Sequence, residues 1–570
     1  MSEQQSVEIF KGRRYLALGL FLLGMAALLG RAAQLELFDR EFLQNQADAR
    51  HLRVVEIPAH RGMITDRNGE PLAISTPVDS VWANPQELML ASGELPQLAR
   101  LLGLKTEKLQ RLLAKREGRE FVYLKRHVRP DLARKVMALD LPGVSLQREF
   151  HRYYPAGEVT AHLVGMTNID DLGQEGLELS YNESLRGEPG AKRVVRDGRG
   201  RIIEEVELIR AMRPGQPLQL SIDRRIQYLA YRELKAAVKQ HKATSGSLVL
   251  LDVRSGEVLA MVNQPSYNPN RRSGQKSSAR RNRAVTDVFE PGSPIKPFTV
   301  ASALENRLIK PSTVINTSPG YYRIGRKTVS DFRDYGALSI GDVLVKSSNV
   351  GASKIAQKLE SEQLWSMLSR VGFGESTASG FPGESAGVLS NFHRWRKVEH
   401  ATHSYGYGLS VTPLQLAHAY SVLAADGAQY PVTLLKNSEP AEGEQVITPQ
   451  VARQVRNMLE GVVSRKGTGY KAHVVGYRVA GKTGTVHKAV AGGYAEDRYH
   501  SVFTGMAPVS EPRLVMVVMV NDPRNGDYYG GAVAAPVFSK VMSGALRLLG
   551  LPPDDMPVRA SASTEKRGPA

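Results

Sequence analysis

Three short segments contain side chains that could together carry out serine acyl transfer. They are Ser293-Pro-Ile-Lys296, Ser347-Ser-Asn349 and Lys482-Thr-Gly-Thr485, in this order along the chain. Such a set combines a nucleophilic hydroxyl, an amine that takes its proton, a second hydroxyl that passes protons, and a group that holds a carboxylate. Each segment is a common pattern by itself, and the order and surroundings of all three make the signal specific.

The first segment is predicted to begin a helix. Glu290-Pro-Gly292 is a turn signal, and an apolar stretch of helical character starts at Pro297. Residues three apart share one face of a helix, so we expect the Lys296 amine within reach of the Ser293 hydroxyl. The helix dipole disfavours an ammonium at this end, which lets a lysine act as a base. Two further Ser-x-x-Lys matches, at residues 273–276 and 563–566, precede no apolar helix.

The other two segments also have ordinary structural explanations. Ser347-Ser-Asn349 could cap a helix or form a turn, and its functional interpretation requires the Ser347 and Asn349 side chains to point at the nucleophile. Lys482-Thr-Gly-Thr485 is predicted to be part of an edge strand, whose glycine lets a ligand come close.

The elements expected around these segments suggest one sheet with helices packed on it. Strand-like runs span residues 247–252, 257–262, 501–506 and 513–520, and the first two are joined as a hairpin. Thr412-Pro413 and Thr448-Pro449 are helix starts. Because strands lie at both ends of this region, we expect an α+β catalytic domain over residues 218–550, with a central antiparallel sheet covered by helices.

The N-terminal part of the chain is predicted to cross a membrane once. Residues 15–37 are mostly apolar and about as long as a spanning helix needs to be. Lys11, Arg13 and Arg14 precede them, which favours a cytoplasmic tail at residues 1–14 and an extracytoplasmic location for the rest of the chain. A cleaved signal peptide is an alternative, but no small-x-small cleavage site follows a short apolar core. A buried helix of a soluble protein is another alternative.

Residues 38–212 are expected to form a stalk and a separate, non-catalytic domain. Residues 34 to about 52, which lead into this region, are helical in pattern, with Leu35, Leu37, Phe42 and Leu43 spaced for one face. Asn68-Gly69 is a hairpin turn signal, residues 213–217 form the clearest linker, and residues 556–570 have the composition of a disordered tail.

Composition and charge exclude several classes of function. With 570 residues the chain needs more than one domain, and the absence of cysteine removes thiol catalysis and cysteine-ligated metals. The net charge is +18, but no nucleic-acid-binding motif accompanies it, and the basic run from Arg271 to Arg283 is predicted to be a solvated loop. His400-Ala-Thr-His403, with His393 nearby, is predicted to be a group of surface histidines. We therefore expect no metal, no cofactor and no nucleic acid.

These segments, taken together, resemble those of the class B penicillin-binding proteins, the peptidoglycan D,D-transpeptidases, and within them the cell-division type, FtsI. The resemblance covers nearly the whole chain. Further similar segments are His60–Ala73, Arg152–Pro155, Gly176–Glu178, Tyr405–Gly408, Thr412–Leu416 and Tyr528–Gly531. It implies that residues 38–212 hold an elongated α+β pedestal domain of the dimerisation type, beside the transpeptidase domain and the single transmembrane helix.

The resemblance also implies a role for each site residue. Ser293 attacks the carbonyl between the last two D-alanines of a stem peptide, and Lys296 takes its proton. Ser347, held near Lys482, passes a proton to the leaving D-alanine, and Asn349 orients Lys296. A second stem peptide then attacks the acyl-enzyme, and β-lactams would leave Ser293 acylated. The residues expected to bind the substrate are Thr483, Gly484 and Thr485, with Tyr407, Tyr499, Tyr528 and Tyr529 as candidates for an aromatic wall over the cleft.

The same resemblance implies partners and a location. The partners would be stem peptides ending in D-Ala-D-Ala, β-lactams, the lipid bilayer, a membrane glycosyltransferase of the FtsW type and other division proteins. The chain would be a single-pass protein of the inner membrane, with its N-terminus in the cytoplasm and its catalytic domain in the periplasm.

Several alternatives stay open at this point. They are an elongation-type transpeptidase, a D,D-carboxypeptidase or β-lactamase-like hydrolase, and a non-catalytic division scaffold. Class A β-lactamases add a glutamate that activates the deacylating water, and no Glu-Leu-Asn segment of that kind lies between Asn349 and Lys482. The chain departs from its FtsI-like relatives at His487, where they often carry Arg or Lys, and at Pro294. We hypothesise that His487 makes recognition of charged ligands pH-sensitive.

Overall fold

A computed structural model of the chain describes residues 11–38, 52–196, 202–271, 274 and 276–555. The predicted C-terminal tail, most of the predicted stalk and most of the predicted cytoplasmic tail lie outside the described residues. The chain divides into two compact units, and each unit is built from several separate stretches of the sequence. One holds residues up to 60 with 77–150 and 187–214, and the other holds residues 61–76, 151–186 and the chain from 215 onward. The sequence predicts a single boundary between the two domains, at the linker of residues 213–217. These domain boundaries stay a prediction.

The first unit begins with the apolar helix. Helix α1 (Lys11–Ala33) continues into a π-helical turn (Gln34–Phe38). The most apolar 18-residue stretch within residues 12–37 has a mean hydropathy of 1.9, and by length and composition residues 12–37 form one helix that could cross a membrane. The predicted span at residues 15–37 lies within it.

Two antiparallel sheets and a group of short helices make up the rest of the first unit. Strands β1 (Leu52–Ile57), β8 (Gly190–Arg196) and β9 (Ile202–Arg210) form one sheet. In the other, residues 79–83 of β3 (Pro71–Ala83) pair with β4 (Val122–Val128), and β5 (Val144–Tyr153) also pairs with β3. The helices that share an apolar core with this sheet are α3 (Pro85–Leu90), α4 (Leu95–Leu102), α5 (Thr106–Ala114) and α6 (Pro130–Met137).

The second unit begins with the predicted hairpin at Asn68-Gly69. Strand β2 (Ile64–Thr65) pairs antiparallel with the start of β3, and Gly69 has a φ of 87°, which glycine tolerates in a tight turn. The hairpin turn is therefore confirmed.

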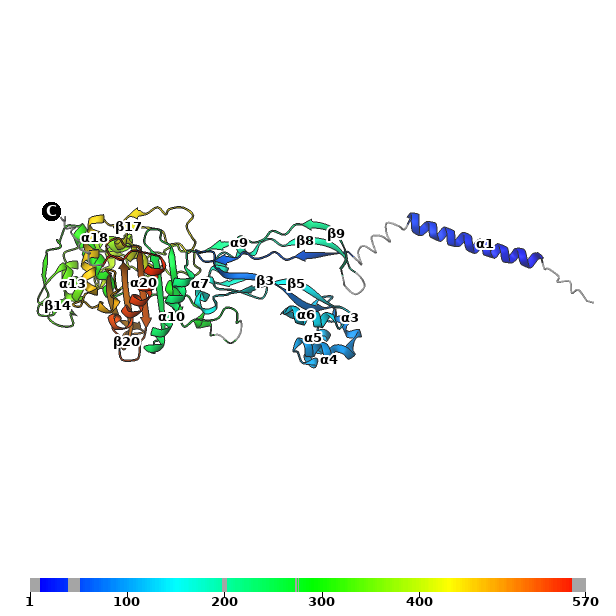
Figure 1. Ribbon diagram of the computed structural model, residues 1–570, viewed down its shortest axis with the longest axis horizontal. Helices are drawn as coiled ribbons and strands as arrows, with labels where there is room; N and C mark the ends of the chain where they lie inside the picture. The colour runs from blue at the N-terminus through cyan, green and yellow to red at the C-terminus, as the bar shows by residue number, and fades with distance from the viewer. Residues whose placement is uncertain (1–10, 39–51, 197–201, 272–273, 275, 556–570) are drawn as a thin grey trace, which may run out of the picture. The chain divides into compact units, whose positions relative to one another are not determined.

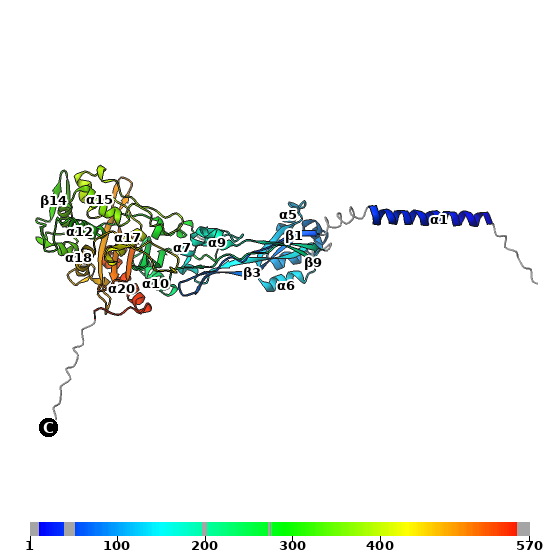
Figure 2. The ribbon, with the colours of Figure 1, turned by 90° about the horizontal axis from the view of Figure 1, so that it is seen from above.

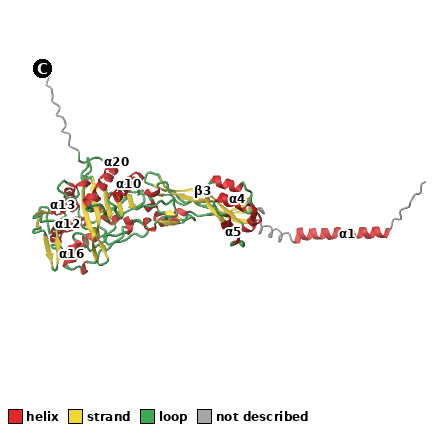
Figure 3. Cartoon of the chain, turned by 90° about the horizontal axis from the view of Figure 1, so that it is seen from below, coloured by secondary structure: helices red, strands yellow, loops and turns green. Residues whose placement is uncertain are grey.

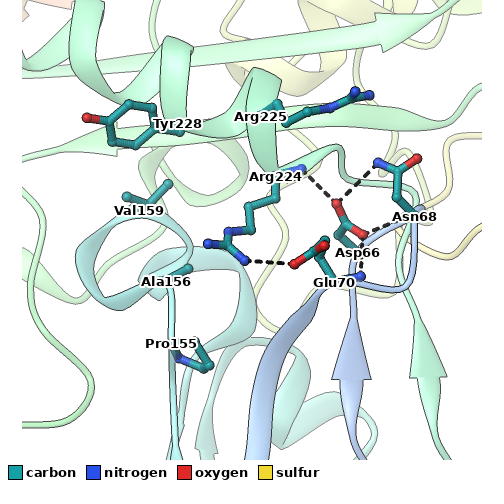
Figure 4. Close-up of a pocket in the computed structure, with 9 residues that line it drawn as sticks. All are labelled: Asp66, Asn68, Glu70, Pro155, Ala156, Val159, Arg224, Arg225 and Tyr228. Carbon is teal, nitrogen blue, oxygen red and sulfur yellow. Dashed lines mark hydrogen bonds and ion pairs between the residues drawn. The ribbon is translucent and has the colours of Figure 1, made fainter. Parts of the chain in front are cut away.

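The buried carboxylate of Asp66 holds this turn against a helix. It accepts hydrogen bonds from the backbone N–H groups of Asn68 at 2.7 Å, Glu70 at 2.9 Å and Arg224 at 3.1 Å. Arg224 is the first residue of helix α10 (Arg224–Gln240), so the carboxylate sits at the positive end of the helix dipole. These residues border a hollow of about 680 Å³, across which Arg224 also pairs with Glu70 (Figure 4).

A five-stranded antiparallel sheet forms the centre of the second unit. Its strands follow the order β12 (Val258–Gln264), β11 (Ser245–Asp252), β21 (Leu514–Asn521), β20 (Gly493–Ala507) and β19 (Ala480–Val490). The four predicted strands lie in it, and β19 is an edge strand. The predicted fold class, a central antiparallel sheet covered by helices, is confirmed.

Both faces of this sheet are buried, because apolar residues alternate between two cores. Leu248 and Leu250 pack with α10 and α20 (Ala535–Leu548) on one face (Figure 1). Val249 and Leu251 belong to the core on the other face, which includes α17 (Pro413–Ala424). A strand with two covered faces is apolar at every position, as residues 248–251 are. Helices and strands alternate in layers through this unit (Figure 3).

Further helices surround the second core. Helices α12 (Lys296–Glu305), α17 and α18 (Pro449–Glu460) pack together there (Figure 2). The predicted helix starts at Thr412 and Thr448 are confirmed, and the Thr412 side chain accepts a hydrogen bond from the Gln415 backbone N–H. The remaining elements include α7 (Ala161–Val164), β6 (Met166–Thr167), β7 (Gly173–Glu175), α8 (Gly176–Ser180), α9 (Asn182–Arg186), β10 (Leu218–Gln219), α11 (Arg283–Thr286), β13 (Val314–Asn316), β14 (Tyr321–Ile324), β15 (Lys327–Ser330), β16 (Ala337–Ser339), α13 (Ile340–Lys346), α14 (Asn349–Ala356), α15 (Ser361–Arg370), α16 (Lys397–His403), β17 (Ala428–Gln429), β18 (Glu444–Gln445) and α19 (Gly530–Val533).

A fully buried ion cluster joins three segments that lie far apart in the sequence, at Arg61, Arg152 and Glu178. The Glu178 carboxylate accepts hydrogen bonds from Arg61 at 2.7 Å and from Arg152 at 2.6 Å, and all three side chains are inaccessible to solvent. Arg61 also donates to the Asn182 side chain, and Arg152 to Ser75. Removing one partner would leave buried charges without compensation, which costs more than the intact cluster contributes.

Replacing Glu178 by glutamine should therefore destabilise the second unit strongly. The substitution preserves size but leaves two buried guanidinium groups facing a neutral amide, and we expect a loss of about 3–5 kcal/mol in the free energy of unfolding. Denaturant unfolding followed by tryptophan fluorescence measures it. The control Glu442→Gln makes the same change at an exposed loop position, where an effect within about 0.5 kcal/mol is expected. Equal stability of the two variants would contradict the assignment.

Candidate active site

Ser293 and Lys296 lie one turn apart where a loop enters helix α12. A 3₁₀ turn (Ser293–Ile295) leads directly into the helix, and i and i+3 side chains eclipse in such a turn. Gly292 precedes it with a φ of 64°, and a Cβ at this position would lie 2.4 Å from the Val486 side chain. Glycine is therefore required to bring the nucleophile close to β19. The Lys296 Nζ lies 3.0 Å from the Ser293 Oγ.

Helix α12 is buried on all sides, unlike an ordinary surface helix. Every residue from Lys296 to Leu304 is buried, and the helix contacts α14, α15 and α18. Tyr420 of α17 donates a hydrogen bond of 2.7 Å to the Pro294 carbonyl. Proline within the first motif thus fits the turn, and its carbonyl fixes the turn to the core.

Ser347 occupies the junction of two helices. It follows α13 as its C-cap residue with a left-handed backbone (φ 60°, ψ 36°), which a residue other than glycine adopts at a cost of order 1–3 kcal/mol. Ser348 caps the next helix, α14, through its side chain, and Asn349 is the first residue of that helix. The helix-cap explanation and the functional explanation of this segment are therefore both satisfied.

Lys482 reaches the site from the edge strand β19. Its side chain is fully buried, while those of Thr483 and Thr485 point to the other face of the strand, as the two-residue period requires. A Cβ at Gly484 would lie 2.9 Å from the Pro294 ring, so glycine lets the strand pack against the nucleophile turn.

The three segments meet at the hydroxyl of Ser347. Its Oγ lies 2.9 Å from the Ser293 Oγ, 3.3 Å from the Lys296 Nζ and 2.8 Å from the Lys482 Nζ. Lys296 also donates to the Asn349 Oδ1 at 2.8 Å. The structure thus brings together all five predicted catalytic side chains.

Burial dominates the electrostatics of both lysines. Burial, and then the charge of Lys482, holds the pKa of Lys296 well below its usual value. Burial also lowers the pKa of Lys482 to about 7. A neutral amine at Lys296 can accept the proton of a serine hydroxyl, which makes general-base catalysis possible near neutral pH.

A cavity of about 650 Å³ opens above these groups. Ser293, Ser347 and Asn349 line its floor, and Thr483 and Thr485 line it from the edge strand. The Thr485 hydroxyl accepts a hydrogen bond of 3.0 Å from the backbone N–H of Gly530. The other residues that line it are Asp331, Phe332, Tyr335, Lys346, Thr468, Tyr470, Lys471, Tyr529, Gly531 and Ala532.

The structure separates the four tyrosines that were expected in an aromatic wall. Tyr529 lines the cavity, and Tyr528 and Tyr499 continue from it as a stack with centroid distances of 4.4 and 4.2 Å. Tyr407 lies outside this stack and packs edge-on against Tyr494 at 5.6 Å.

Sequence reasoning missed Asp331 and Thr468. Thr468 shares a hydrogen bond of 2.8 Å with Thr483, and Asp331 holds the backbone of Asn349. Neither residue is part of a local pattern, because both meet their partners only through the fold. The only available signal is that Asp331 follows a strand-like run.

The prediction that the histidine cluster lies at the surface is wrong for two of its three members. His400 and His403 were predicted at the surface, but they are buried, and the His403 ring stacks on Trp395 at 4.1 Å. Both rings lie against Trp395, and the His403 ring also packs against Gly408, which explains the difference; His393 is the exposed member of the group. Within the described ranges, no group of three or more His, Asp or Glu side chains is arranged to hold a metal ion.

Comparisons with known proteins match both halves of the chain. The penicillin-binding protein transpeptidase domain matches residues 246–543, and the penicillin-binding protein dimerisation domain matches residues 56–220. The peptidoglycan D,D-transpeptidase FtsI of Escherichia coli K12 is 45% identical over 558 residues, covering 97% of this chain and 94% of its own length.

Solved structures agree with this. Penicillin-binding protein 3 of Mycobacterium tuberculosis, in complex with aztreonam, is 28% identical with a TM-score of 0.69, covering 88% of this chain and 98% of that one. The transpeptidase domain of Burkholderia pseudomallei penicillin-binding protein 3 is 45% identical with a TM-score of 0.55, covering 59% of this chain and 98% of its own. The chain therefore belongs to the class B penicillin-binding proteins, whose transpeptidase domain is joined to a dimerisation domain.

Proposed function

We propose that this protein is a peptidoglycan D,D-transpeptidase that cross-links stem peptides through a serine acyl-enzyme during septal wall synthesis. One observation carries the proposal: the Ser293, Lys296, Ser347 and Lys482 side chains converge with neighbouring polar atoms 2.8–3.3 Å apart, and the two serines line one cavity. The septal role is supported by the 45% identity to a protein named FtsI. Stem peptides are the proposed substrates, and β-lactams are the proposed inhibitors that acylate Ser293.

In the first step, the Ser293 Oγ bonds to the carbonyl carbon between the last two D-alanines while Lys296 takes the hydroxyl proton. The oxyanion would lie between the backbone N–H groups of Ser293 and Thr485, where loss of one donor typically costs about 10²–10³ in rate. The C–N bond then breaks, and Ser347 passes a proton to the leaving D-alanine. Thr483 and Thr485 hold its carboxylate, with the charge of Lys482 behind them.

In the second step, the amine of another stem peptide attacks the acyl-enzyme and releases Ser293. Asn349 keeps the Lys296 amine in line, as its hydrogen bond of 2.8 Å allows. The stack of Tyr499, Tyr528 and Tyr529 beside the cavity would exclude water and favour the amine over hydrolysis.

The proposed location rests on the apolar helix α1, and the proposed partners rest on the resemblance. We propose that helix α1 spans the inner membrane once, with residues 1–14 in the cytoplasm and the catalytic domain in the periplasm. Lys11, Arg13 and Arg14 at the start of the apolar helix support this orientation. A membrane glycosyltransferase of the FtsW type and other division proteins are the partners proposed from the resemblance.

Labelling by a fluorescent penicillin should depend on Ser293. The Ser293→Ala variant loses the nucleophile, so we expect no covalent label after gel electrophoresis. Ser273→Ala and Ser563→Ala, at the two other Ser-x-x-Lys matches, serve as controls and should label as the wild type does. Persistent labelling of Ser293→Ala would refute the assignment, and an unlabelled wild type would refute the proposed function.

The penicilloyl-enzyme should decay slowly. Among the described residues that line the cavity, Asp331 is the one carboxylate, and its oxygens are engaged by hydrogen bonds to Ser348, Asn349 and Val350. It is therefore not placed to activate a deacylating water. Release of label after removal of free penicillin measures the decay. Rapid turnover would favour the hydrolase alternative.

His487 should make acylation by anionic ligands pH-dependent. It lies on β19 beside Tyr499, with ring centroids 4.6 Å apart, and its Nδ1 lies 2.9 Å from the Ala495 carbonyl. Histidine in general changes charge between about pH 5 and 8, and only its imidazolium form attracts an anion. As the pH rises through this range, the acylation rate with a dianionic penicillin should fall by up to about fivefold relative to the rate with a monoanionic one. A fivefold change corresponds to about 1 kcal/mol, the upper end for an ion pair near the surface. The His487→Arg variant should lack this fall, and identical profiles would contradict the hypothesis.

A further inference from the structure

A buried histidine joins the loop before helix α16 to the loop after it. His403 is the last residue of the helix and is 2% exposed. Its ring stacks on Trp395, with centroids 4.1 Å and planes 21° apart. The ring also lies against Gly408, where a Cβ would be 3.1 Å from the His403 Cε1. The position of the residues that follow α16 therefore depends on this ring.

Residues 404–411 form a supporting segment that is hydrogen-bonded to both flanks of Ser293. The four pairs are Thr299 with the Ser404 carbonyl at 2.8 Å, Gly292 with the Gly406 carbonyl at 3.0 Å, Gly408 with the Glu290 carboxylate at 2.8 Å, and Phe289 with Val411 at 3.0 Å. The approach is closest at Gly406, where a Cβ would lie 2.0 Å from the Gly292 carbonyl oxygen. Because Gly292 directly precedes Ser293, a shift of the supporting segment moves the nucleophile.

A neutral ring fits this place better than a charged one. The His403 Nδ1 lies 2.6 Å from the Glu399 carbonyl, so it is assigned the ring proton. Its Nε2 is buried and makes no hydrogen bond among the residues that the structure describes. A second proton at Nε2 would place a charge and an unpaired donor in the interior, and burying such a group is costly. Protonation therefore favours a state in which the ring has moved out toward solvent.

Several charged and titratable groups lie on α16 or on the elements around it. They are Arg396, Glu399 and His400 at the helix itself, Glu290 beside the nucleophile, Glu360 at the start of α15, Lys354 on α14, and Tyr405 and Tyr407 on the supporting segment. Burial lowers the pKa of His403, and the carbonyl and carboxylate of Glu399 oppose this lowering only in part. The packed ring thus binds a proton less well than a solvated histidine, whose pKa is about 6.5. Its packing is at full strength above this pH and weakens as the pH falls below it.

We propose that His403 is a positioning residue for acyl transfer: its neutral ring, packed on Trp395 and Gly408, holds the supporting segment against Ser293, and its protonation in mildly acidic solution releases that support. The inference rests on the proposed function, and it assigns His403 no contact with the reacting atoms. It predicts a loss of acylation at low pH with every penicillin, whereas the effect expected of His487 depends on the charge of the ligand.

Stopped-flow acylation with a monoanionic chromogenic penicillin tests the proposal on the full-length protein in detergent. It separates the dissociation constant of the initial complex from the rate constant of acylation, which is measured between about pH 5 and 8. His403→Phe keeps an aromatic ring on Trp395 but cannot be protonated. We expect its rate constant to equal that of the wild type at about pH 8 and to exceed it at least about fivefold at about pH 5. Protonation of the two lysines slows both proteins alike, so the ratio of the two rate constants reports on His403.

His403→Ala removes the ring and leaves space beneath the supporting segment. A displacement of about 1 Å costs about 10²-fold in rate, and the four hydrogen bonds limit the displacement, so we expect about a tenfold loss in the acylation rate constant at about pH 8. The dissociation constant should change by less than about twofold. His393→Phe is the matched control for His403→Phe, because it makes the same change at the exposed histidine of the group, and it should follow the wild type at every pH.

The outcomes separate this inference from the proposed function. An unacylated wild type would refute the proposed function. Acylation with a ratio of His403→Phe to wild type that stays constant between about pH 5 and 8 would refute only the role of His403. A loss in His403→Ala confined to the dissociation constant, or a pH profile of His393→Phe that matches that of His403→Phe, would overturn this role as well. If His403→Ala shows no cooperative unfolding transition, the ratio for His403→Phe decides alone.

Discussion

Two buried lysine side chains contact one serine hydroxyl, that of Ser347. The other elements of the second unit hold these two amines in place. Lys296 and Lys482 are inaccessible to solvent, yet their amines lie 3.3 and 2.8 Å from the Ser347 Oγ. Two ammonium groups so close in a low-dielectric interior would repel each other and lose their hydration. Oxygen acceptors compensate for the lost hydration. Lys296 donates hydrogen bonds to the Asn349 amide oxygen and the Ser347 carbonyl, and Lys482 donates one to the Thr483 carbonyl.

Each of the three catalytic segments is fixed by a different physical means. The nucleophile turn is held by a helix that is buried on all sides and by the Tyr420 hydroxyl. The edge strand approaches it because Gly484 has no Cβ to meet the Pro294 ring. The Ser347 segment lies between two helix ends, which use its backbone and side-chain groups as caps. Because the three supports are independent, no single element determines the geometry, and the site exists only in the complete fold.

Much of this arrangement could be predicted from the sequence. The central sheet was predictable because runs such as residues 248–251 are apolar at every position, and the helix starts at Thr412 and Thr448 are marked by a local Thr-Pro pair. The catalytic side chains were found because their spacing is local within each motif. Asp331 was not found, since its three partners lie 17–19 residues away and no short pattern joins them. The burial of His400 and His403 was missed because a polar pair on a short helix carries no sign of the Trp395 ring that covers it.

The left-handed backbone of Ser347 has a consequence for how this enzyme can be improved in the laboratory. Glycine and asparagine adopt this conformation at lower cost than serine does, so either would relieve a local strain of order 1 kcal/mol. Only a hydroxyl at this position, however, can bridge Ser293 and Lys482. A screen that rewards thermal tolerance alone would therefore enrich substitutions at residue 347 and discard the enzyme's activity with them. Directed evolution of this chain needs a selection for acylation in every round.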